Sequence, residues 1–472
     1  MTVTNKSDIG LIGMAVMGQN LALNMESKGY RISVYNRTSS RTEEFVASRG
    51  EGRDVRPAYS IEELVSSLSR PRKVMLMVKA GDPVDAVIEE LVPHLDEGDI
   101  LIDGGNSHFP DTDRRLNDLE ERGILYLGTG VSGGEYGALH GPSIMPGGHR
   151  EAYDEVGGLL EKTAAATELG PCCTYLGPGS AGHYVKMVHN GIEYGVMEGI
   201  AESYWFMKEL LGMEPGAMAD RFEDWNESVN SYLMEITVDI LRKKDEKTGN
   251  PLIDVILDKA KQKGTGKWSV QSSLDLGIPI PTITAGVQAR ILSAHKRERE
   301  KMAERIDWSL SRPEEFGLGD LEKSLDLVTV SAYGQGMKLL AAASEEFVYG
   351  LELDEVARIW MDGCIIRSDL LGELRKAYSD NPGLENVFFD EGFAGLLQEE
   401  IGSLRRTVHE AKKSGLPFIA FSSTLDYLDS IVAERLPANI IQAQRDYFGA
   451  HTYERVDEEG RFHTDWLEEG ND

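Results

Sequence analysis

The fold of the first part of this 472-residue chain is decided by the stretch Ile9-Gly10-Leu11-Ile12-Gly13-Met14-Ala15-Val16-Met17-Gly18. An apolar run typical of a buried strand leads here into a Gly-x-Ala-x-x-Gly turn, and a helical pattern follows at 19–27. Gly13 permits the tight bend, Ala15 keeps the backbone close to a pyrophosphate, and Gly18 lets helix and strand approach. The first N–H groups of the helix can bind phosphates. The stretch therefore predicts a dinucleotide site, with a plain tight turn as the alternative.

Further short apolar runs alternate with helical patterns up to about residue 130, at 31–35, 73–78, 100–102 and 124–127. This rhythm predicts a parallel sheet with helices on both faces. After Gly177-Pro178-Gly179 the helical period dominates, and from Asn439 the chain has little core pattern. We expect an α/β Rossmann-type N-terminal domain (1–180), a large all-α domain (181–438) and a C-terminal tail (439–472). The tail is expected to be disordered or to dock on another surface.

The end of the second expected strand indicates which dinucleotide is bound. It reads Asn36-Arg37-Thr38, where an NAD enzyme would place an acid against the ribose 2′-hydroxyl. An arginine at this point can hold a 2′-phosphate instead. Arg37 therefore favours NADP, with a solvated loop charge as the alternative.

Composition excludes several classes of function. Lys and Arg number 49 against 79 Asp and Glu, which leaves a formal charge of −30 and makes binding to nucleic acid or to a membrane surface unfavourable. Any anionic ligand must then bind in a local basic pocket. The three cysteines form no Cys-x-x-Cys pair, which is typical of a reducing compartment. With no apolar run of about 18 residues and no signal pattern, the sequence predicts a soluble, cytoplasmic protein.

One face of the helix expected from Ala181 carries polar side chains at helical spacing, namely Lys186, His189, Asn190, Glu193 and Tyr194. A lysine that is partly desolvated and near other cations can lose its proton near neutral pH and act as a base, and a glutamate on the same face can supply a second proton. The alternative is a solvated face with one ion pair. No group of side chains has the spacing of a metal site.

Three glycines at four-residue intervals follow on the same helix, at Gly191, Gly195 and Gly199. Because each glycine costs about 1 kcal/mol of helix propensity relative to alanine, three of them indicate close approach of another backbone or a ligand.

Loops add further candidates. Asp103-Gly104-Gly105-Asn106-Ser107 and Ser132-Gly133-Gly134 each follow an expected strand, at the sheet edge where ligands bind in open α/β folds. The stretch 263–268, Lys-Gly-Thr-Gly-Lys-Trp, is typical of an anion-binding loop, with a hydrated basic turn as the alternative. Taken alone, Arg290 and Arg445 are read as surface charges.

A weak internal repeat runs through the helical region. Tyr194-Gly195 and Leu211-Gly212-Met213-Glu214 recur as Tyr333-Gly334 and Tyr349-Gly350-Leu351-Glu352, about 138 residues later. Duplication of a helical unit would explain this repeat, and chance similarity between amphipathic helices remains the alternative.

Together these segments resemble the 6-phosphogluconate dehydrogenases, NADP-dependent decarboxylating oxidoreductases of the pentose phosphate pathway and of gluconate utilization. The resemblance covers essentially the whole chain. Its most specific motifs are the Lys186–Tyr194 segment, Gln262–Trp268 and the stretch from Gln442 to His451. The glycine turn is shared with the wider β-hydroxyacid dehydrogenases.

The resemblance implies oxidative decarboxylation of 6-phospho-D-gluconate to D-ribulose 5-phosphate and CO2. Lys186 would take the proton of the 3-hydroxyl and later return it to the enolate oxygen, and Glu193 would protonate C1 of the enediol. It also implies a homodimer in which Arg445 and His451 reach the partner's site.

The resemblance assigns the remaining roles as follows. The cofactor would bind at Gly13, Met14, Ala15, Val16, Met17, Gly18, Asn36, Arg37, Thr38, Val78, Lys79, Ala80 and Asn106. The substrate hydroxyls and carboxylate would bind at Asn106, Ser132, Gly133, Gly134, His189 and Asn190. The substrate phosphate would bind at Tyr194, Lys263, Thr265, Arg290 and Arg445, with His451 nearby.

Two alternatives stay open. A non-decarboxylating β-hydroxyacid dehydrogenase would not be expected to need Glu193 or the phosphate-binding residues. An NADP-binding protein without turnover would have no use for a poised lysine.

Overall fold

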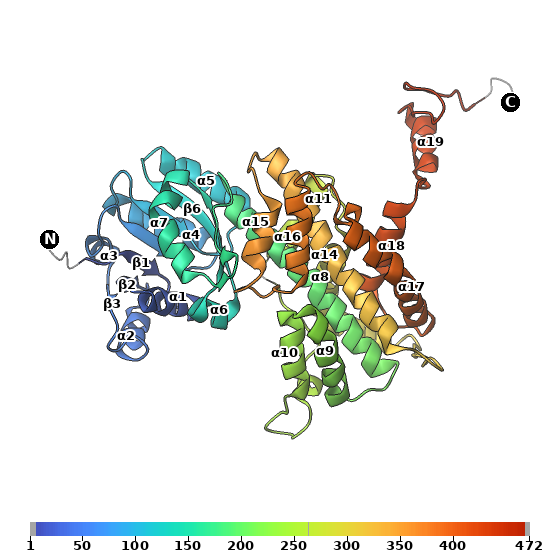
Figure 1. Ribbon diagram of the computed structural model, residues 1–472, viewed down its shortest axis with the longest axis horizontal. Helices are drawn as coiled ribbons and strands as arrows, with labels where there is room; N and C mark the ends of the chain where they lie inside the picture. Colours follow the sequence, from blue (N-terminus) through green and yellow to red (C-terminus); the bar gives the residue numbers. More distant parts are fainter. Residues whose placement is uncertain (1–5, 263, 468–472) are drawn as a thin grey trace.

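A computed structural model of the protein describes residues 6–262 and 264–467. A sheet domain lies at one end of the molecule and a larger helical domain at the other, and the last helix projects from the helical domain (Figure 1). Within the described residues, none of the helices has the length and apolar character needed to cross a membrane.

The main sheet has seven strands in the order β3-β2-β1-β4-β5-β6-β7. The first six pair in parallel, starting from Ile9 opposite Ile32, and β7 runs antiparallel to β6. A separate small pair consists of β8 and β9. The strands are β1 (Ile9–Ile12), β2 (Ile32–Tyr35), β3 (Val55–Pro57), β4 (Lys73–Leu76), β5 (Ile100–Asp103), β6 (Leu125–Ser132), β7 (Ser143–Gly148), β8 (Ala166–Thr167) and β9 (Gly170–Pro171).

Helices cover both faces of this sheet, as expected for a Rossmann-type domain, and two apolar clusters fill the layers between helices and strands. The helices of this domain are α1 (Val16–Ser27), α2 (Ser39–Ala47), α3 (Ile61–Ser66), α4 (Asp82–Leu91), η1 (Val92–His94), α5 (Phe109–Glu120), α6 (Gly134–His140) and α7 (Arg150–Thr163).

The parallel sheet carries one antiparallel strand, β7, at its edge, which the sequence did not indicate. Strand β7 reads Ser-Ile-Met-Pro-Gly-Gly, a composition typical of a turn, yet all six residues are buried. It becomes a strand because β6 supplies its hydrogen-bonding partners and α8 packs over it. Strand β3 was also missed, since its three residues form no apolar run.

The helical domain contains the same order of elements twice. Each half begins with a 29-residue helix and continues with two helices, a short 3₁₀ turn and two further helices, and this order supports duplication over chance. The first half is α8 (Ala181–Glu209), α9 (Pro215–Val229), α10 (Tyr232–Arg242), η2 (Leu252–Val255), α11 (Thr265–Asp275) and α12 (Pro281–Ala294). The second half is α14 (Leu318–Glu346), α15 (Leu353–Trp360), α16 (Leu370–Asp380), η3 (Val387–Phe389), α17 (Glu391–Lys413) and α18 (Ile419–Val432).

Helix α13 (Lys296–Ala303) connects the two halves. The long helices α8 and α14 pack against each other, and one apolar cluster runs through both halves. The glycine stripe on α8 lies at these contacts. A Cβ added at Gly199 would lie 2.9 Å from Val328 of α14, and one added at Gly191 would lie 3.0 Å from Ser269 of α11.

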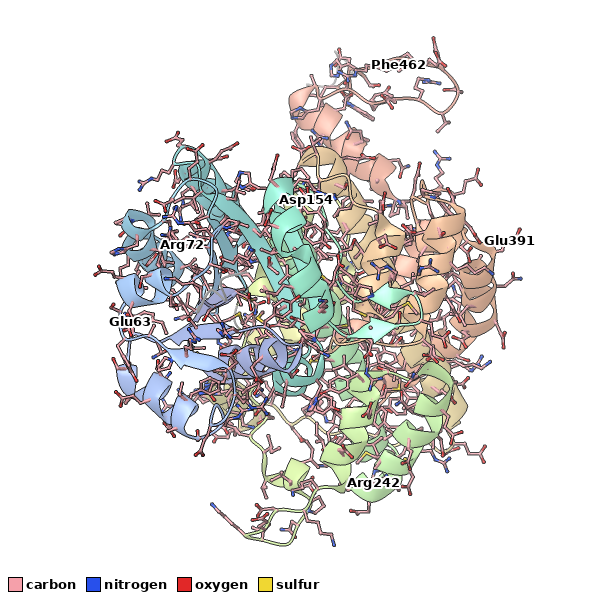
Figure 2. All side chains as sticks on the ribbon, turned by 60° about the vertical axis from the view of Figure 1, so that its left-hand side comes forward. Glu63, Arg72, Asp154, Arg242, Glu391 and Phe462 are labelled. Carbon is pink, nitrogen blue, oxygen red and sulfur yellow. The ribbon has the colours of Figure 1, made fainter. Side chains whose placement is uncertain are left out.

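The C-terminal segment has more structure than its composition suggested. The predicted boundary between the all-α domain and the tail lies after Ala438. Helix α19 (Ala438–Gly449) begins at that residue, so the predicted boundary falls within the first turn of this helix. Figure 2 shows Phe462 in the segment that follows α19, outside the body of the molecule. The break between body and tail lies after α18, which ends at Val432.

Candidate active site

Helix α8 brings its first turns directly onto the sheet. A Cβ added at Gly182 would lie 2.2 Å from the carbonyl oxygen of Gly128 in β6, and one added at Gly130 would lie 2.4 Å from the Cβ of Lys186. Glycine on both elements therefore lets helix and strand touch, and only 4% of Lys186 is exposed. No sequence signal marks Gly128, Gly130 or Gly182, because their role depends on which elements pack together.

The environment of Lys186 favours its neutral form. Burial lowers the pKa of its amine to about 8, although the nearby Glu193 and Cys364 act in the opposite direction. Among the described residues, burial alone lowers this pKa, and the contribution expected from neighbouring cations is not found there. An amine of this kind is half-deprotonated near pH 8 and can act as a general base.

Lys186 is the end of a short chain of polar contacts. Its Nζ lies 3.3 Å from Nδ1 of His189, and Nε2 of His189 lies 3.0 Å from Oγ of Ser132 at the end of β6. Burial, and then the charge of Lys186, lower the pKa of His189 well below its usual value. A neutral imidazole can accept from the lysine and donate to the serine. Three residues predicted for the site therefore lie together, and the ring of Trp360 makes a T-shaped contact with His189, with the ring centroids 5.5 Å apart.

Asn190 and Glu193 form the next pair along the same face of α8. The Asn190 amide donates a 2.6 Å hydrogen bond to a carboxylate oxygen of Glu193. Its own carbonyl oxygen, Oδ1, is buried and has no hydrogen-bond partner among the described residues. Because an unpaired buried acceptor is unfavourable, this oxygen is suited to accept a hydrogen bond from a hydroxyl group of a bound polyol.

One turn further, Tyr194 is enclosed by two later helices. The guanidinium of Arg290 on α12 lies 3.5 Å from the centre of its ring. Gly266 follows the buried Thr265, and a Cβ added at Gly266 would lie 2.7 Å from Cδ2 and Cε2 of the Tyr194 ring. Tyr194, Thr265 and Arg290 therefore come together, as the resemblance implied, and could hold an anion.

The stretch at 263–268 differs from the expected loop. Residues from Thr265 onwards form the first turn of α11, with Gly264 as its N-cap in the left-handed region. Lys263, predicted to contact the substrate phosphate, lies outside the described residues. Trp268 stacks on His108, with ring centroids 4.5 Å apart, so this turn also contacts the sheet domain.

The loop that carries Asn106 is organised by Asp103, the last residue of β5. The Asp103 carboxylate accepts hydrogen bonds from the Gly105 amide at 3.0 Å and the Ser107 hydroxyl at 2.6 Å. These bonds shape the loop, and Asn106 is left exposed at its tip. Ser132-Gly133-Gly134 ends β6 and begins α6, where Gly133 approaches the carbonyl oxygen of Gly363.

A buried arginine that sequence reasoning missed connects two of these loops. Arg115 on α5 is almost fully buried and hydrogen-bonds both Asp85 on α4 and the carbonyl oxygen of Gly81, beside the Val78-Lys79-Ala80 segment. It also lies 3.5 Å from Asp103. On the other side, His183 of α8 contacts the Asp103 carbonyl oxygen at 3.0 Å. This network joins the loops at the ends of β4 and β5 to the helix that carries Lys186.

The glycine turn fits the phosphates of a dinucleotide. Gly13 has φ +106°, and a Cβ added there would lie 2.4 Å from the carbonyl oxygen of Met77. A Cβ added at Gly18 would lie 1.9 Å from the carbonyl oxygen of Gly13. Ala15, the N-cap of α1, has no polar side chain to occupy the first N–H groups, so they can bind an anion.

The turn is tied to the end of β2. The Met14 amide donates a 3.0 Å hydrogen bond to the Asn36 side chain, and the Asn36 amide donates to the Thr38 carbonyl oxygen. Arg37 is exposed between them. An exposed arginine at the end of the strand that the turn contacts suits a cofactor with an additional phosphate.

Two predicted site residues lie apart from the others. Arg445 is exposed on α19 and His451 follows that helix, while α19 points away from the sheet domain beyond α18 (Figure 1). Within one chain, the residues described do not bring Arg445 or His451 to Lys186.

A Rossmann-type sheet with a glycine turn, joined to a helix that carries a buried lysine, defines a dehydrogenase that uses a nicotinamide dinucleotide. Residues 8–177 match the family model described as the NAD binding domain of 6-phosphogluconate dehydrogenase, and residues 182–466 match that of its C-terminal domain. The chain belongs to the 6-phosphogluconate dehydrogenase family.

Relatives cover the full length of the chain. It is 52% identical over 468 residues to the NADP(+)-dependent, decarboxylating 6-phosphogluconate dehydrogenase of Bacillus subtilis, which covers 98% of this chain and 100% of the relative. It is 51% identical to the decarboxylating enzyme of Synechococcus elongatus, covering 97% and 99%. A solved structure of the Plasmodium falciparum enzyme, described in apo form and in complex with its cofactor NADP+ and its substrate 6-phosphogluconate, has a TM-score of 0.93 and 47% identity, covering 97% and 100%.

Proposed function

We propose that this protein catalyses the oxidative decarboxylation of 6-phospho-D-gluconate to D-ribulose 5-phosphate and CO2, with NADP as the cofactor, in the pentose phosphate pathway. The observation that carries this proposal is the buried Lys186 with its lowered pKa, placed on one face of α8 with Glu193. The full-length similarity to decarboxylating, NADP-dependent relatives supports it.

Lys186 starts the reaction as a general base by taking the proton of the substrate 3-hydroxyl. When bound, NADP accepts the hydride that leaves C3. The resulting 3-keto acid can lose its carboxylate as CO2, because the electron pair left at C2 delocalises into the ketone. Lys186, now an ammonium, donates its proton to the developing enolate oxygen. Glu193 in its protonated form then donates a proton to C1 of the enediol, while the neutral Lys186 takes back the proton of the hydroxyl it had protonated, and the ketone of the product forms.

Other side chains bind and orient the substrate in this proposal. Ser132, His189 and Asn190 surround Lys186 and offer hydroxyl, imidazole and amide groups to the sugar hydroxyls and carboxylate. Asn106, Gly133 and Gly134 contribute from the sheet edge, and Tyr194, Thr265 and Arg290 bind the phosphate. The cofactor is held by the turn from Gly13 to Gly18, by Asn36, Arg37 and Thr38, and by the loop segments Val78–Ala80 and Asn106.

We further propose a homodimer in which the tail completes the partner's site. Its α19 has exposed apolar side chains, and more than half of each is accessible in the single chain: Ile440, Ile441, Tyr447 and Phe448. Arg445 and His451 of one chain would then bind the substrate phosphate in the other. In this division residues 1–180 bind NADP, and the all-α domain from Ala181 supplies the substrate site and the dimer contacts.

A cytoplasmic location is part of the proposal. Cys172, Cys173 and Cys364 are all free thiols and all buried, which suits a reducing compartment.

The decisive experiment mixes metal-stripped protein with 6-phosphogluconate and NADP and follows NADPH absorbance and CO2 release together, with NAD as the control. Stoichiometric NADPH and CO2 are expected. NADPH without CO2 would favour a non-decarboxylating β-hydroxyacid dehydrogenase. Neither product, from folded protein that binds NADP, would favour a binding protein without turnover.

A further inference from the structure

The tail is built around one buried carboxylate. Asp446 lies in the last turn of α19 and is the one helix residue there with no exposed surface. The segment that follows turns back so that Tyr453 and Phe462 pair as an isolated antiparallel bridge. A segment with so few apolar contacts needs another source of order, and the polar contacts of Asp446 supply it.

Both oxygens of Asp446 are fully used. Oδ1 accepts from the Thr452 amide and lies against Nδ1 of His463, each at 2.9 Å. Oδ2 accepts from the Thr464 amide at 3.0 Å and from Nε1 of Trp466 at 2.8 Å. Four groups from three points along the tail therefore converge on one side chain. Hydrogen bonds to a carboxylate are about twice as strong as neutral ones, so together they can hold the tail in one conformation.

These contacts also fix the two predicted phosphate-binding residues. Arg445 precedes Asp446, and its guanidinium donates a 3.0 Å hydrogen bond to Gln442, whose amide in turn donates to the Thr452 carbonyl oxygen. His451 lies between Ala450 and Thr452, which both have positive φ, +49° and +59°. A non-glycine residue adopts this conformation only when its surroundings hold it there. The bond from the Thr452 amide to Asp446 is what holds the turn.

We infer that Asp446 is a positioning residue for substrate binding: it locks the tail into a rigid unit that presents Arg445 and His451 to the phosphate of 6-phosphogluconate in the partner subunit's site. This inference rests on the proposed function. Asp446 itself does not contact the substrate. Substrate affinity then requires the tail to be held in this conformation as well as to be present.

The test is the variant Asp446→Asn with Asp457→Asn as the matched control. An amide keeps the size of the carboxylate but places an NH2 group against two of the four donors, so the hydrogen bonds to those two donors are lost. Asp457 lies in the same tail, is exposed, and is paired across the surface with Arg455. Both changes remove one charge from the same segment, so their difference isolates the buried contacts.

We expect Asp446→Asn to raise KM for 6-phosphogluconate by about tenfold or more, since a misplaced binding group loses most of its effect. The Kd for NADP and the dimeric state should be unchanged, and Asp457→Asn should behave as wild type. In the Arg445→Ala/His451→Ala background, Asp446→Asn should add little, because it acts through those two residues.

Equal KM values for Asp446→Asn and Asp457→Asn would overturn the inference, as would a loss of the dimer or of NADP affinity in Asp446→Asn alone. Hydrogen exchange of the tail provides a readout that needs no catalysis. The amides of Thr452 and Thr464 should be protected in wild type and in Asp457→Asn, and unprotected in Asp446→Asn. If wild type shows this protection but does not turn over 6-phosphogluconate, the proposed function fails and the tail lock stands.

Discussion

Lys186 shows how a single burial can create a base. The side chain is enclosed by β6 and by its own helix, and the loss of water lowers the pKa of its amine to about 8. His189 remains neutral beside it, since its own pKa lies well below the usual value. The amine therefore has a neutral partner that can orient it without competing for the proton.

This environment predicts the pH dependence of the reaction. Lys186 accepts a proton only when it is neutral, so kcat/KM for 6-phosphogluconate should rise as pH increases through about 8 and fall below it. The Kd for NADP, measured over the same range, should stay level and serve as the control.

Lys186→Met should abolish oxidation and retain NADP binding. Turnover in that variant would reject the base assignment.

Arg37 predicts cofactor choice. Arg37→Ala should lower kcat/KM with NADP by roughly 10- to 100-fold, because a charge-assisted contact to phosphate is lost, and should change the value with NAD by less than about twofold. Steady-state kinetics with both cofactors would test this. An unchanged NADP/NAD ratio would contradict the role given to Arg37.

At the scale of elements, the loops at the ends of β4 and β5 depend on Arg115. Its guanidinium is buried between Asp85, Asp103 and the Gly81 carbonyl oxygen, so its removal would leave the buried Asp103 carboxylate without its nearest cation. The neighbouring Arg114 pairs with the same Asp85 but is half exposed. The two arginines therefore provide a matched pair of buried and surface contacts.

Arg115→Leu should lower the free energy of unfolding by about 3–5 kcal/mol, because a buried pair is broken from one side. Arg114→Leu should cost less than about 1 kcal/mol. Urea unfolding followed by circular dichroism would measure both values. Similar losses in the two variants would show that burial at Arg115 is not what matters.

Close helix packing is the second element-scale feature. A Cβ added at Gly286 of α12 would lie 2.4 Å from the Tyr194 carbonyl oxygen, whereas one at Gly395 of α17 would meet nothing within 4 Å. Gly286→Ala should therefore destabilise the protein by about 1–3 kcal/mol and weaken 6-phosphogluconate binding through Tyr194. Gly395→Ala should stabilise it by up to about 1 kcal/mol. Thermal unfolding and substrate Kd would test both, and a neutral Gly286→Ala would contradict the packing argument.

What could be predicted from the sequence follows from how local each signal is. The turn from Gly13 to Gly18 and the face from Lys186 to Tyr194 depend on residues within a few turns of one another, so their spacing was sufficient. Strand β7 and Arg115 depend on contacts with other elements of the fold. A Pro-Gly-Gly strand is stable only beside β6, and a buried arginine in an amphipathic helix has no local mark. Helix α19 was missed because it buries almost no apolar surface of its own.

For the whole molecule, charge and shape act together on the ligands. The formal charge of −30 opposes the approach of anionic cofactor and substrate, so binding depends on a few local groups such as Arg290 over Tyr194. Two further groups, Arg445 and His451, belong to the tail, whose helix α19 projects away from the body (Figure 1). In the proposed homodimer, a second chain would complete the anion site.

Mixing two variants that are each inactive at a low substrate concentration would reveal this exchange. Lys186→Met has a normal tail, and Arg445→Ala has a normal Lys186. In a mixed dimer one site combines an intact body with an intact tail, so random reassortment should restore about a quarter of wild-type activity. Each variant alone, carried through the same dissociation and reassociation, is the control. No recovery on mixing would show that each tail serves its own chain.

The projecting tail has a consequence for how the activity responds to dilution. If α19 of each chain completes the other chain's site, separated subunits keep the glycine turn and Lys186 but lack part of the phosphate pocket. Specific activity would then decline once the protein is diluted below the dissociation constant of the dimer, while the number of NADP molecules bound per chain stayed the same. Catalytic competence would thus depend on protein concentration. Because the substrate would contact both chains, its binding would also stabilise the dimer.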